Sequence, residues 1–208
     1  MHDVVLTPET KASLEVLAGW AVNLRLYLAG GTGCALQLGH RMSQDLDFFT
    51  PGTFEPSEIQ NTLQPRGEAI ADHTDSGTWV GRFSGVKVGF FHYQYPMIGA
   101  FRTFLGVQIA SLEDIGCMKI EAIAGRGKKR DFIDLYFILK NLGFDLEELV
   151  GLFRRKYGGE CRNMIHILKS LVYFDDAETD PDPRMLVEYS WLGTKQFISG
   201  AVKRMSVF

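Results

Sequence analysis

Residues 27–49, YLAGGTGCALQLGHRMSQDLDFF, decide the fold. A short apolar run ends at a Gly-Gly-Thr turn, and small residues typical of a closely packed helix follow. The segment ends in a predicted strand, in which Asp45 and Asp47 alternate with Leu46 and Phe48. Because side chains two residues apart in a strand share a face, both carboxylates project to one side and both apolar side chains to the other.

The two carboxylates predict a site for a divalent metal. Held a few ångströms apart, Asp45 and Asp47 repel each other unless a cation lies between them. Mg²⁺ (or Mn²⁺) suits such a site, because it takes a few carboxylates together with phosphates of a substrate. A solvated strand face is the plain structural interpretation of the same pattern.

The turn Gly30-Gly31-Thr32 predicts a phosphate-binding helix start. Glycine lets backbone N–H groups approach a phosphate, and the N-terminus of a helix favours negative charge. The turn lacks the Gly-Lys-Ser/Thr of a P-loop and the third glycine of a dinucleotide fingerprint. A glycine pair is often only a turn, but a metal pair beside a phosphate cradle is what phosphoryl transfer needs.

The composition of the chain is that of an ordinary globular protein. Its 208 residues are 46% hydrophobic and 23% charged with a net charge of −3, which excludes disorder and argues against a wholesale nucleic-acid binder. Cys34, Cys117 and Cys161 are too widely spaced for a disulfide framework or a zinc site. No run approaches 18 uncharged apolar residues, so we expect no membrane span and a cytoplasmic location.

The hydrophobic pattern predicts an α+β protein with a mixed β-sheet. We expect an α/β core over residues 1–110 and a helical extension over 111–208 that packs on it. Strands are predicted at 26–29, 44–50, 68–73, 78–83, 86–93 and 104–109. Helices are predicted at 7–20, 32–38, 56–63, 111–124, 129–141, 145–157, 162–171 and 184–204.

Several short motifs resemble those of one known family. GGT at 30–32, HRMS at 40–43 and DLDFF at 45–49 are followed by KIEA at 119–122 and RDFIDLY at 130–136. In this order they resemble the two signatures of the AbiEii/AbiGii-type toxin nucleotidyltransferases. The resemblance implies a DNA polymerase β-like fold and a metal-dependent transfer of a nucleotide from an NTP. It also implies an acceptor that can be tRNA or another RNA, and a cognate antitoxin protein as partner.

The resemblance and the residue chemistry together assign candidate roles. Asp45 and Asp47 are candidate metal ligands, and with Asp131 they are the candidate catalytic residues. The candidate nucleotide-binding residues are Gly30, Gly31, Thr32, Arg41, Lys119 and Arg130. The neighbouring bases Arg126, Lys128 and Lys129 are either a phosphate clamp or a solvated surface.

Gly89 departs from the family pattern, which normally carries a third carboxylate on a later strand. Asp131 or Asp134 can replace that acid, or one metal can suffice. Alternatively, the chain is a catalytically weakened or inactive nucleotide-binding module or scaffold. The ordinary interpretation of Asp134 is an ion pair with Arg130, four residues earlier on the same helix.

Three further features leave alternatives open. Arg154, Arg155 and Lys156 could extend a path for an RNA acceptor. The aromatic residues at 90–95 are those of a core or of a base-stacking platform. The acidic stretch DDAETDPDP at 175–183 is predicted to be a solvated linker, with a partner-facing or self-shielding segment as the alternative.

Overall fold

The protein is built around a mixed β-sheet. Its computed structural model describes residues 1–21, 24–158 and 163–205. The described strands form one seven-stranded sheet in the order β3-β4-β5-β2-β1-β7-β6. The strands are β1 (Tyr27–Leu28), β2 (Leu46–Thr50), β3 (Ala69–Asp75), β4 (Thr78–Phe83), β5 (Val86–His92), β6 (Arg102–Phe104) and β7 (Val107–Ile109).

Parallel and antiparallel pairs alternate at the centre of the sheet. β2 runs parallel to β5, and in this register Asp47 lies opposite Gly89. β1 is antiparallel to β2 and parallel to β7, while the outer pairs β3–β4, β4–β5 and β6–β7 are antiparallel. The predicted α+β class with a mixed sheet is therefore confirmed.

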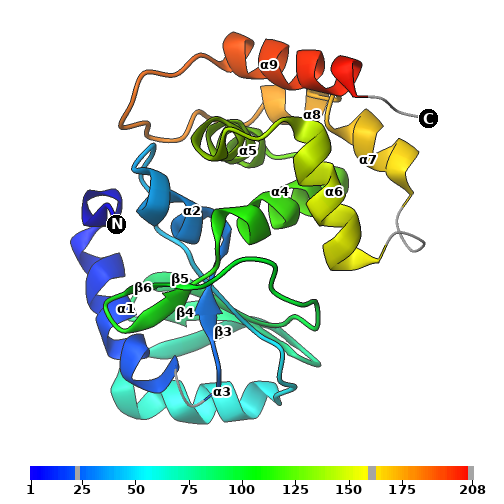
Figure 1. The fold of residues 1–208 in the computed structure, drawn as a ribbon. Coiled ribbons are helices and arrows are strands. Elements are labelled where there is room, and N and C mark those ends of the chain that lie inside the picture. Colours follow the sequence, from blue (N-terminus) through cyan, green and yellow to red (C-terminus); the bar gives the residue numbers. More distant parts are fainter. Residues whose placement is uncertain (22–23, 159–162, 206–208) are drawn as a thin grey trace.

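Helices cover both faces of the sheet and continue into a helical layer beyond it. In Figure 1, α1 and α3 lie on the side of the sheet away from the helical layer, and α2 and α4 lie between the sheet and that layer. α5, α8 and α9 lie above α2 and α4, while α6 and α7 lie to the right of α4. The helices are α1 (Pro8–Ala21), α2 (Gly30–Leu38), α3 (Pro56–Leu63), α4 (Leu112–Arg126), α5 (Lys129–Leu142), α6 (Leu146–Tyr157), α7 (Met164–Ser170), α8 (Asp175–Glu178) and α9 (Trp191–Arg204). No helix of the described ranges is long and apolar enough to cross a membrane.

The alternation predicted for β2 fixes the two faces of the sheet. Leu46 and Phe48 are fully buried in the apolar core beneath α1 and α3, where Phe48 stacks on Phe90 at 5.3 Å. Burying each such side chain stabilises the fold by about 2 kcal/mol. Asp47 and Phe49 are half-buried on the opposite face. The apolar side of β2 thus holds the strand in place while the other side presents the carboxylate.

The helical layer has its own apolar core. It joins α4, α5, α6, α7 and α9 through buried residues such as Phe132, Leu149, Phe153 and Ile198. A third cluster, which includes Cys34, Ile115 and Ile138, connects α2 to α4 and α5. The division of the chain at residue 110 stays a prediction.

The predicted strand over 104–109 is wrong. β6 and β7 form a hairpin instead, with Leu105 and Gly106 as its two turn residues at φ +49° and +81°. Ser84 and Gly85 adopt the same φ angles in the predicted turn between β4 and β5. Leucine is rare in the left-handed region, so its side chain gave no turn signal.

The end of the chain also differs from the prediction. The helix expected over 184–204 begins only at Trp191, where the side chain of Ser190 accepts a hydrogen bond from the Gly193 N–H and caps it. The preceding residues form no helix, and Met185 forms an isolated antiparallel bridge with Arg41. The helix predicted to begin at 162 is α7, and residue 162 lies outside the described ranges.

Candidate active site

One cavity of about 400 Å³ lies between α2 and β2 on the sheet side and α4 and α5 on the helical side. It collects every residue that the sequence analysis singled out as catalytic, metal-binding or nucleotide-binding. These are Gly30, Gly31, Thr32, Arg41, Asp45, Asp47, Lys119, Arg130 and Asp131. Residues more than 100 positions apart in the sequence thus face one space of a size typical for a small-molecule ligand.

The carboxylate pair lies on the sheet side of this cavity. Asp45 directly precedes β2 and Asp47 lies within it. Burial and the negative charge of Asp45 raise the pKa of the Asp47 carboxyl. A cation lies close to the pair, since Nη1 of Arg130 is 3.5 Å from Oδ2 of Asp45.

This donor set suits a divalent cation. Two crowded carboxylates on one strand face are hard oxygen ligands, and Mg²⁺ keeps several waters or phosphate oxygens besides the protein ligands it takes. Among the described residues, one group of three His, Cys, Asp or Glu side chains has its ligand atoms within 4.8 Å of one another, and it consists of Cys34, His40 and Asp134. No third such side chain therefore lies as close to both Asp45 and Asp47 within the described ranges. Asp45 and Asp47 would hold the ion.

The glycine turn makes room for charged side chains. Gly30 has φ +60°, and a Cβ at this residue would lie 2.8 Å from Oδ2 of Asp47. A Cβ on Gly31 would lie 2.5 Å from Nη2 of Arg41. The backbone therefore approaches the carboxylate and the guanidinium more closely than any residue with a side chain would allow.

The same turn leaves backbone donors at the start of α2. The first bond of the helix turn runs from the Gly33 N–H to the Ala29 carbonyl at 2.9 Å, so the three preceding N–H groups have no partner within the helix. The Thr32 hydroxyl, by contrast, donates to the carbonyl of Asp45 and contacts Ser43 Oγ at 2.8 Å. Its side chain thus positions the carboxylate strand, and only its backbone N–H is left for an anion.

We expect Gly30→Ala to displace Asp47, and Gly143→Ala provides a matched control. Both glycines have positive φ angles, at +60° and +68°, but a Cβ on Gly143 meets no atom within 4 Å. Each substitution should cost about 1–2 kcal/mol of folding free energy, measured by urea unfolding. Only Gly30→Ala should also weaken Mn²⁺ binding measured by calorimetry, and equal Mn²⁺ affinity in the two variants would contradict the account.

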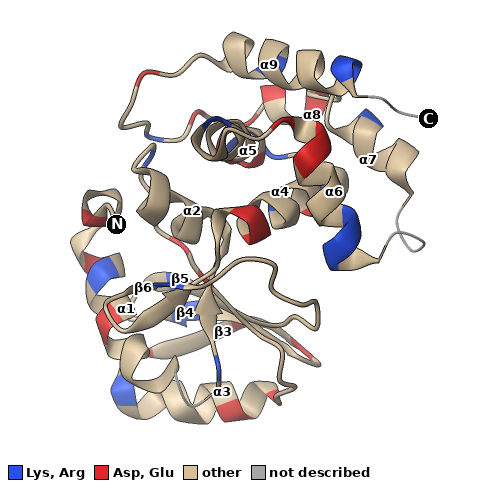
Figure 2. Cartoon of the chain, viewed as in Figure 1, with Lys and Arg blue, Asp and Glu red and all other residues tan. Residues whose placement is uncertain are grey.

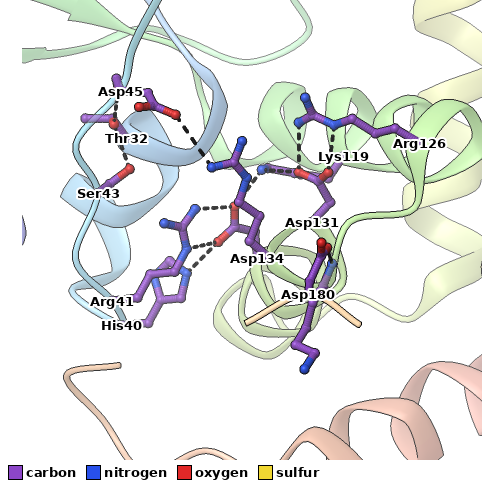
Figure 3. Close-up of polar contacts among 12 residues, drawn as sticks. Thr32, His40, Arg41, Ser43, Asp45, Lys119, Arg126, Asp131, Asp134 and Asp180 are labelled. Atoms are coloured by element: carbon purple, nitrogen blue, oxygen red, sulfur yellow. Dashed lines mark hydrogen bonds and ion pairs between the residues drawn. The ribbon is translucent and has the colours of Figure 1, made fainter. Parts of the chain in front are cut away.

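Asp134 is the centre of a buried charge network behind the turn (Figure 3). Its carboxylate accepts two hydrogen bonds from Arg41, at 2.7 and 2.8 Å, and lies 2.8 Å from Nε2 of His40. Nζ of Lys119 is 2.6 Å away. The predicted pair with Arg130 is wrong, because Arg130 points to Asp45 across the cavity. The cause is tertiary: a fully buried carboxylate needs partners from several elements, not only from its own helix.

Asp131 extends this network to the edge of the cavity. It is fully buried, and its carboxylate accepts hydrogen bonds from Lys119 at 2.8 Å and from Arg126 at 3.1 and 3.3 Å. Burial opposes ionisation of Asp131, but Lys119 and Arg126 outweigh it and lower the pKa of the carboxyl. For Asp134, burial is likewise outweighed by Arg41 and Lys119, which hold its pKa well below the usual range. Both acids are therefore charged and orient the cations of the cavity.

These lowered pKa values predict acid sensitivity of the fold. A carboxyl whose pKa is lower in the folded state stabilises the protein above its unfolded pKa of about 3.9, and that stabilisation is lost as the pH falls through the folded pKa. The free energy of unfolding in urea should thus be steady near neutral pH and fall below about pH 4. A protein whose stability rises below pH 4 would contradict the two ion-paired acids.

The aromatic and apolar part of the cavity was not assigned to the site from the sequence. Phe49, Phe91, Met118 and Tyr157 line it together with Tyr93, whose hydroxyl is 2.5 Å from that of Tyr157. A signal was present for two of them. Phe49 follows Asp47, and Phe91 follows Gly89, at the two-residue spacing that puts strand side chains on one face.

Several basic residues lie elsewhere. Lys128 pairs with Asp180 at 3.2 Å, and Lys129 pairs with Asp182 at 3.2 Å. The acidic stretch is thus not simply a solvated linker. It contains α8, whose acidic residues are red in Figure 2, and its Asp180 accepts a hydrogen bond from the Lys129 N–H at the start of α5. Lys156 is also buried, which removes it from any path for an RNA acceptor.

Comparison with known proteins gives the family. The family model described as nucleotidyl transferase AbiEii toxin, type IV TA system, matches residues 92–190. An uncharacterized protein of Aquifex aeolicus is 36% identical over 204 residues, which is 95% of this chain and 96% of that protein.

Solved structures support the same fold. A crystal structure of a candidate nucleotidyltransferase from H. pylori matches with a TM-score of 0.58 at 17% identity, over 97% of this chain and 92% of that one. MenT4, a nucleotidyltransferase toxin of Mycobacterium tuberculosis, matches with a TM-score of 0.55 at 14% identity, over 99% and 88%. The solved structures share the fold, and by the family-model match over residues 92–190 the chain belongs to the family described as nucleotidyl transferase AbiEii toxin.

Proposed function

We propose that this protein transfers a nucleotide from an NTP to a hydroxyl group of an acceptor, with tRNA or another RNA as that acceptor and pyrophosphate as the leaving group. Mg²⁺ or Mn²⁺ would be held by Asp45 and Asp47. One observation carries the proposal: the carboxylate pair, the N-terminus of α2 and the cations of α4 and α5 all face one cavity. In-line phosphoryl transfer needs these three features together.

The cations of the cavity suit a triphosphate. The side chains of Arg126 and Arg130 are 53% and 48% exposed, so each guanidinium keeps donors that its carboxylate partner does not use. Lys119 adds a positive charge that Asp131 and Asp134 hold in place. The N–H groups at the start of α2 complete the phosphate cradle.

The chain's own groups divide the work of the reaction. A bound metal would polarise the α-phosphate and align the attacking hydroxyl. Arg130 lies 3.5 Å from Asp45, and the donors of its guanidinium that this contact does not use are open to the phosphates. The apolar side of the cavity, with Phe91 and Met118, is suited to the sugar and base and keeps water from that end.

The family also suggests a setting for this activity. Because the family model names a toxin of a toxin–antitoxin system, a cognate antitoxin protein is the proposed partner. The buried free thiols of Cys34 and Cys117 are compatible with a reducing compartment, and we place the protein in the cytoplasm.

Labelled nucleotides test the proposal. The protein is incubated with Mg²⁺, total tRNA and each of the four α-labelled NTPs in turn, and the RNA is then separated. We expect label in the RNA with at least one NTP, and its loss when a chelator removes the metal. If no NTP labels the RNA while an active relative does so under the same conditions, the proposal fails.

Gly89 supports a second candidate, a nucleotide-binding module with weakened or absent catalysis. A Cβ at Gly89 would lie 3.3 Å from Oδ1 of Asp47, so this is the place beside the pair where a third carboxylate would stand. The ring of Phe91 fills that place, at 2.5 Å from the same Cβ. The space that a third carboxylate would need is therefore occupied by the ring of Phe91.

We expect Gly89→Asp alone to fail to add a ligand, because Phe91 blocks it, and Gly89→Asp/Phe91→Ala to succeed. The double variant should bind Mn²⁺ roughly tenfold more tightly, as measured by calorimetry. If the natural chain binds NTP without transfer and the double variant transfers, the chain is a weakened enzyme. If the natural chain and the double variant both bind NTP and neither transfers a nucleotide, the binding module is favoured over the enzyme.

A further inference from the structure

A second cavity, of about 620 Å³, adjoins the candidate active site and shares Tyr93 with it. We call it the flanking cavity. It lies at the start of β1, between the segment that follows β5 and the β6–β7 hairpin, and its lining includes Arg25, Tyr95, Phe101 and Gln108. Neither the carboxylate pair nor the phosphate cradle reaches it.

Aromatic rings form much of its lining. The ring of Tyr27 is 5.3 Å from that of Phe101, and the rings of Tyr93 and Tyr95 are 5.1 Å apart. Phe101 is 38% exposed, so its ring is accessible to a ligand in this cavity. On its far side Tyr27 stacks on Phe49 of the active-site cavity, at 6.0 Å and 26°. A ladder of rings therefore connects the two cavities.

Tyr27 also carries a polar group without a partner. Its side chain is only 2% exposed, and its hydroxyl has no hydrogen-bond partner among the residues that the structure describes. A buried tyrosine hydroxyl normally has one, and an exception points to a ligand or water that belongs there. Burial raises the pKa of Tyr27, so the hydroxyl stays protonated and can donate.

The lining of the flanking cavity is held by buried charges, although the segment after β5 has no regular structure. The carboxylate of Asp114 accepts hydrogen bonds from the N–H groups of Ile98 and Gly99, at 2.9–3.1 Å. Nζ of Lys156 lies 2.7 Å from Asp114 and donates to the Pro96 carbonyl at 2.8 Å. Lys156 and Asp114 come from α6 and α4, so the helical layer fixes the shape of this cavity before any ligand arrives.

We propose that the flanking cavity binds an unpaired nucleobase, stacked on Phe101 and hydrogen-bonded by the Tyr27 hydroxyl. A planar ring with polar edges fits aromatic side chains combined with one buried donor, which is how proteins recognise unstacked bases. The exposed Arg25 at the rim supplies charge for an adjoining phosphate. The proposal rests on the proposed function in one respect: the ring ladder to Phe49 makes this base part of the acceptor.

The test uses 2-aminopurine, a base whose fluorescence falls when it stacks on an aromatic ring. The full-length protein is titrated into 2-aminopurine riboside monophosphate and, separately, into an RNA trinucleotide that ends in 2-aminopurine. Phe101→Ala should weaken binding about tenfold, and Tyr27→Phe about fivefold through the lost hydrogen bond. Tyr173→Ala removes an aromatic ring that is 52% exposed and lines neither cavity, and it should bind as the natural chain does.

The two probes separate the sources of the base. Tighter binding of the trinucleotide identifies an RNA end, and equal binding identifies a free nucleotide; both support the base site. Unchanged affinity in both Phe101→Ala and Tyr27→Phe overturns it. Mg²⁺-dependent binding of a non-hydrolysable NTP analogue is measured on the same proteins. If the natural chain does not bind the NTP analogue, the proposed function is overturned. If it binds the analogue, but 2-aminopurine affinity is the same in Phe101→Ala and Tyr27→Phe as in the natural chain, only the base site is overturned.

Discussion

Asp45→Asn/Asp47→Asn is expected to lower nucleotide transfer by at least about 1,000-fold, because the site loses the charges that hold its metal. Metal ions contribute several kcal/mol to stabilising a phosphoryl-transfer transition state, and each 1.36 kcal/mol is worth tenfold in rate. The double variant should also lose Mn²⁺ binding. Transfer of labelled nucleotide and calorimetric titration with Mn²⁺ measure the two effects.

The same variant should fold at least as well as the natural chain. Burial and the charge of Asp45 raise the pKa of Asp47, which means that its ionised form is disfavoured in the folded state. Asparagine removes that charge, so the free energy of unfolding in the absence of metal should stay equal or rise. Lost transfer with intact stability identifies a functional pair. Undiminished transfer, or a variant that unfolds, would contradict this assignment.

Asp134→Asn is expected to destabilise the fold by about 3–5 kcal/mol, the effect of breaking a buried ion pair on one side only. The buried Arg41 would lose the carboxylate with which it pairs, and the buried Lys119 would keep Asp131 but lose the second of its two carboxylate partners. Total stabilities of such domains are about 5–15 kcal/mol, so this single change would remove a large part. Urea unfolding at neutral pH measures it.

Asp72→Asn is the matched control for this prediction. Among the described residues Asp72 has one ion-pair partner, the exposed Arg82 at 4.0 Å, and exposed pairs contribute about 0–1 kcal/mol. The two variants make the same chemical change at a surface and at a buried site. A loss at Asp134 no larger than that at Asp72 would show that Arg41 and Lys119 do not depend on it.

The sequence was informative wherever local chemistry decides the outcome. The two-residue period of β2 predicted both faces of the strand, and the helix of Pro56–Leu63 and the strand of Thr78–Phe83 have the bounds expected of them. The glycines and the two acids predicted the turn, the helix and the strand between residues 27 and 49, because turn chemistry and strand alternation are local properties.

The sequence did not predict contacts between residues that lie far apart along the chain. Helical spacing favours a pair between Asp134 and Arg130, four residues earlier. No local pattern indicates that Asp134 pairs instead with Arg41, which is 93 residues away in the sequence. The acidic stretch likewise gave no sign that Asp180 and Asp182 would bind Lys128 and Lys129, about 50 residues earlier. Such contacts arise from the packing of the helical layer on the sheet, which periodicity alone does not specify.

The most direct test of the central claim is a crystal structure of the protein with Mn²⁺ and a non-hydrolysable NTP analogue, in which anomalous scattering locates the ion. The account predicts a Mn²⁺ peak in contact with the carboxylates of Asp45 and Asp47. It also predicts the triphosphate between Gly30–Thr32 and the guanidinium groups of Arg126 and Arg130. A Mn²⁺ ion bound away from both carboxylates, or a triphosphate outside this cavity, would contradict it.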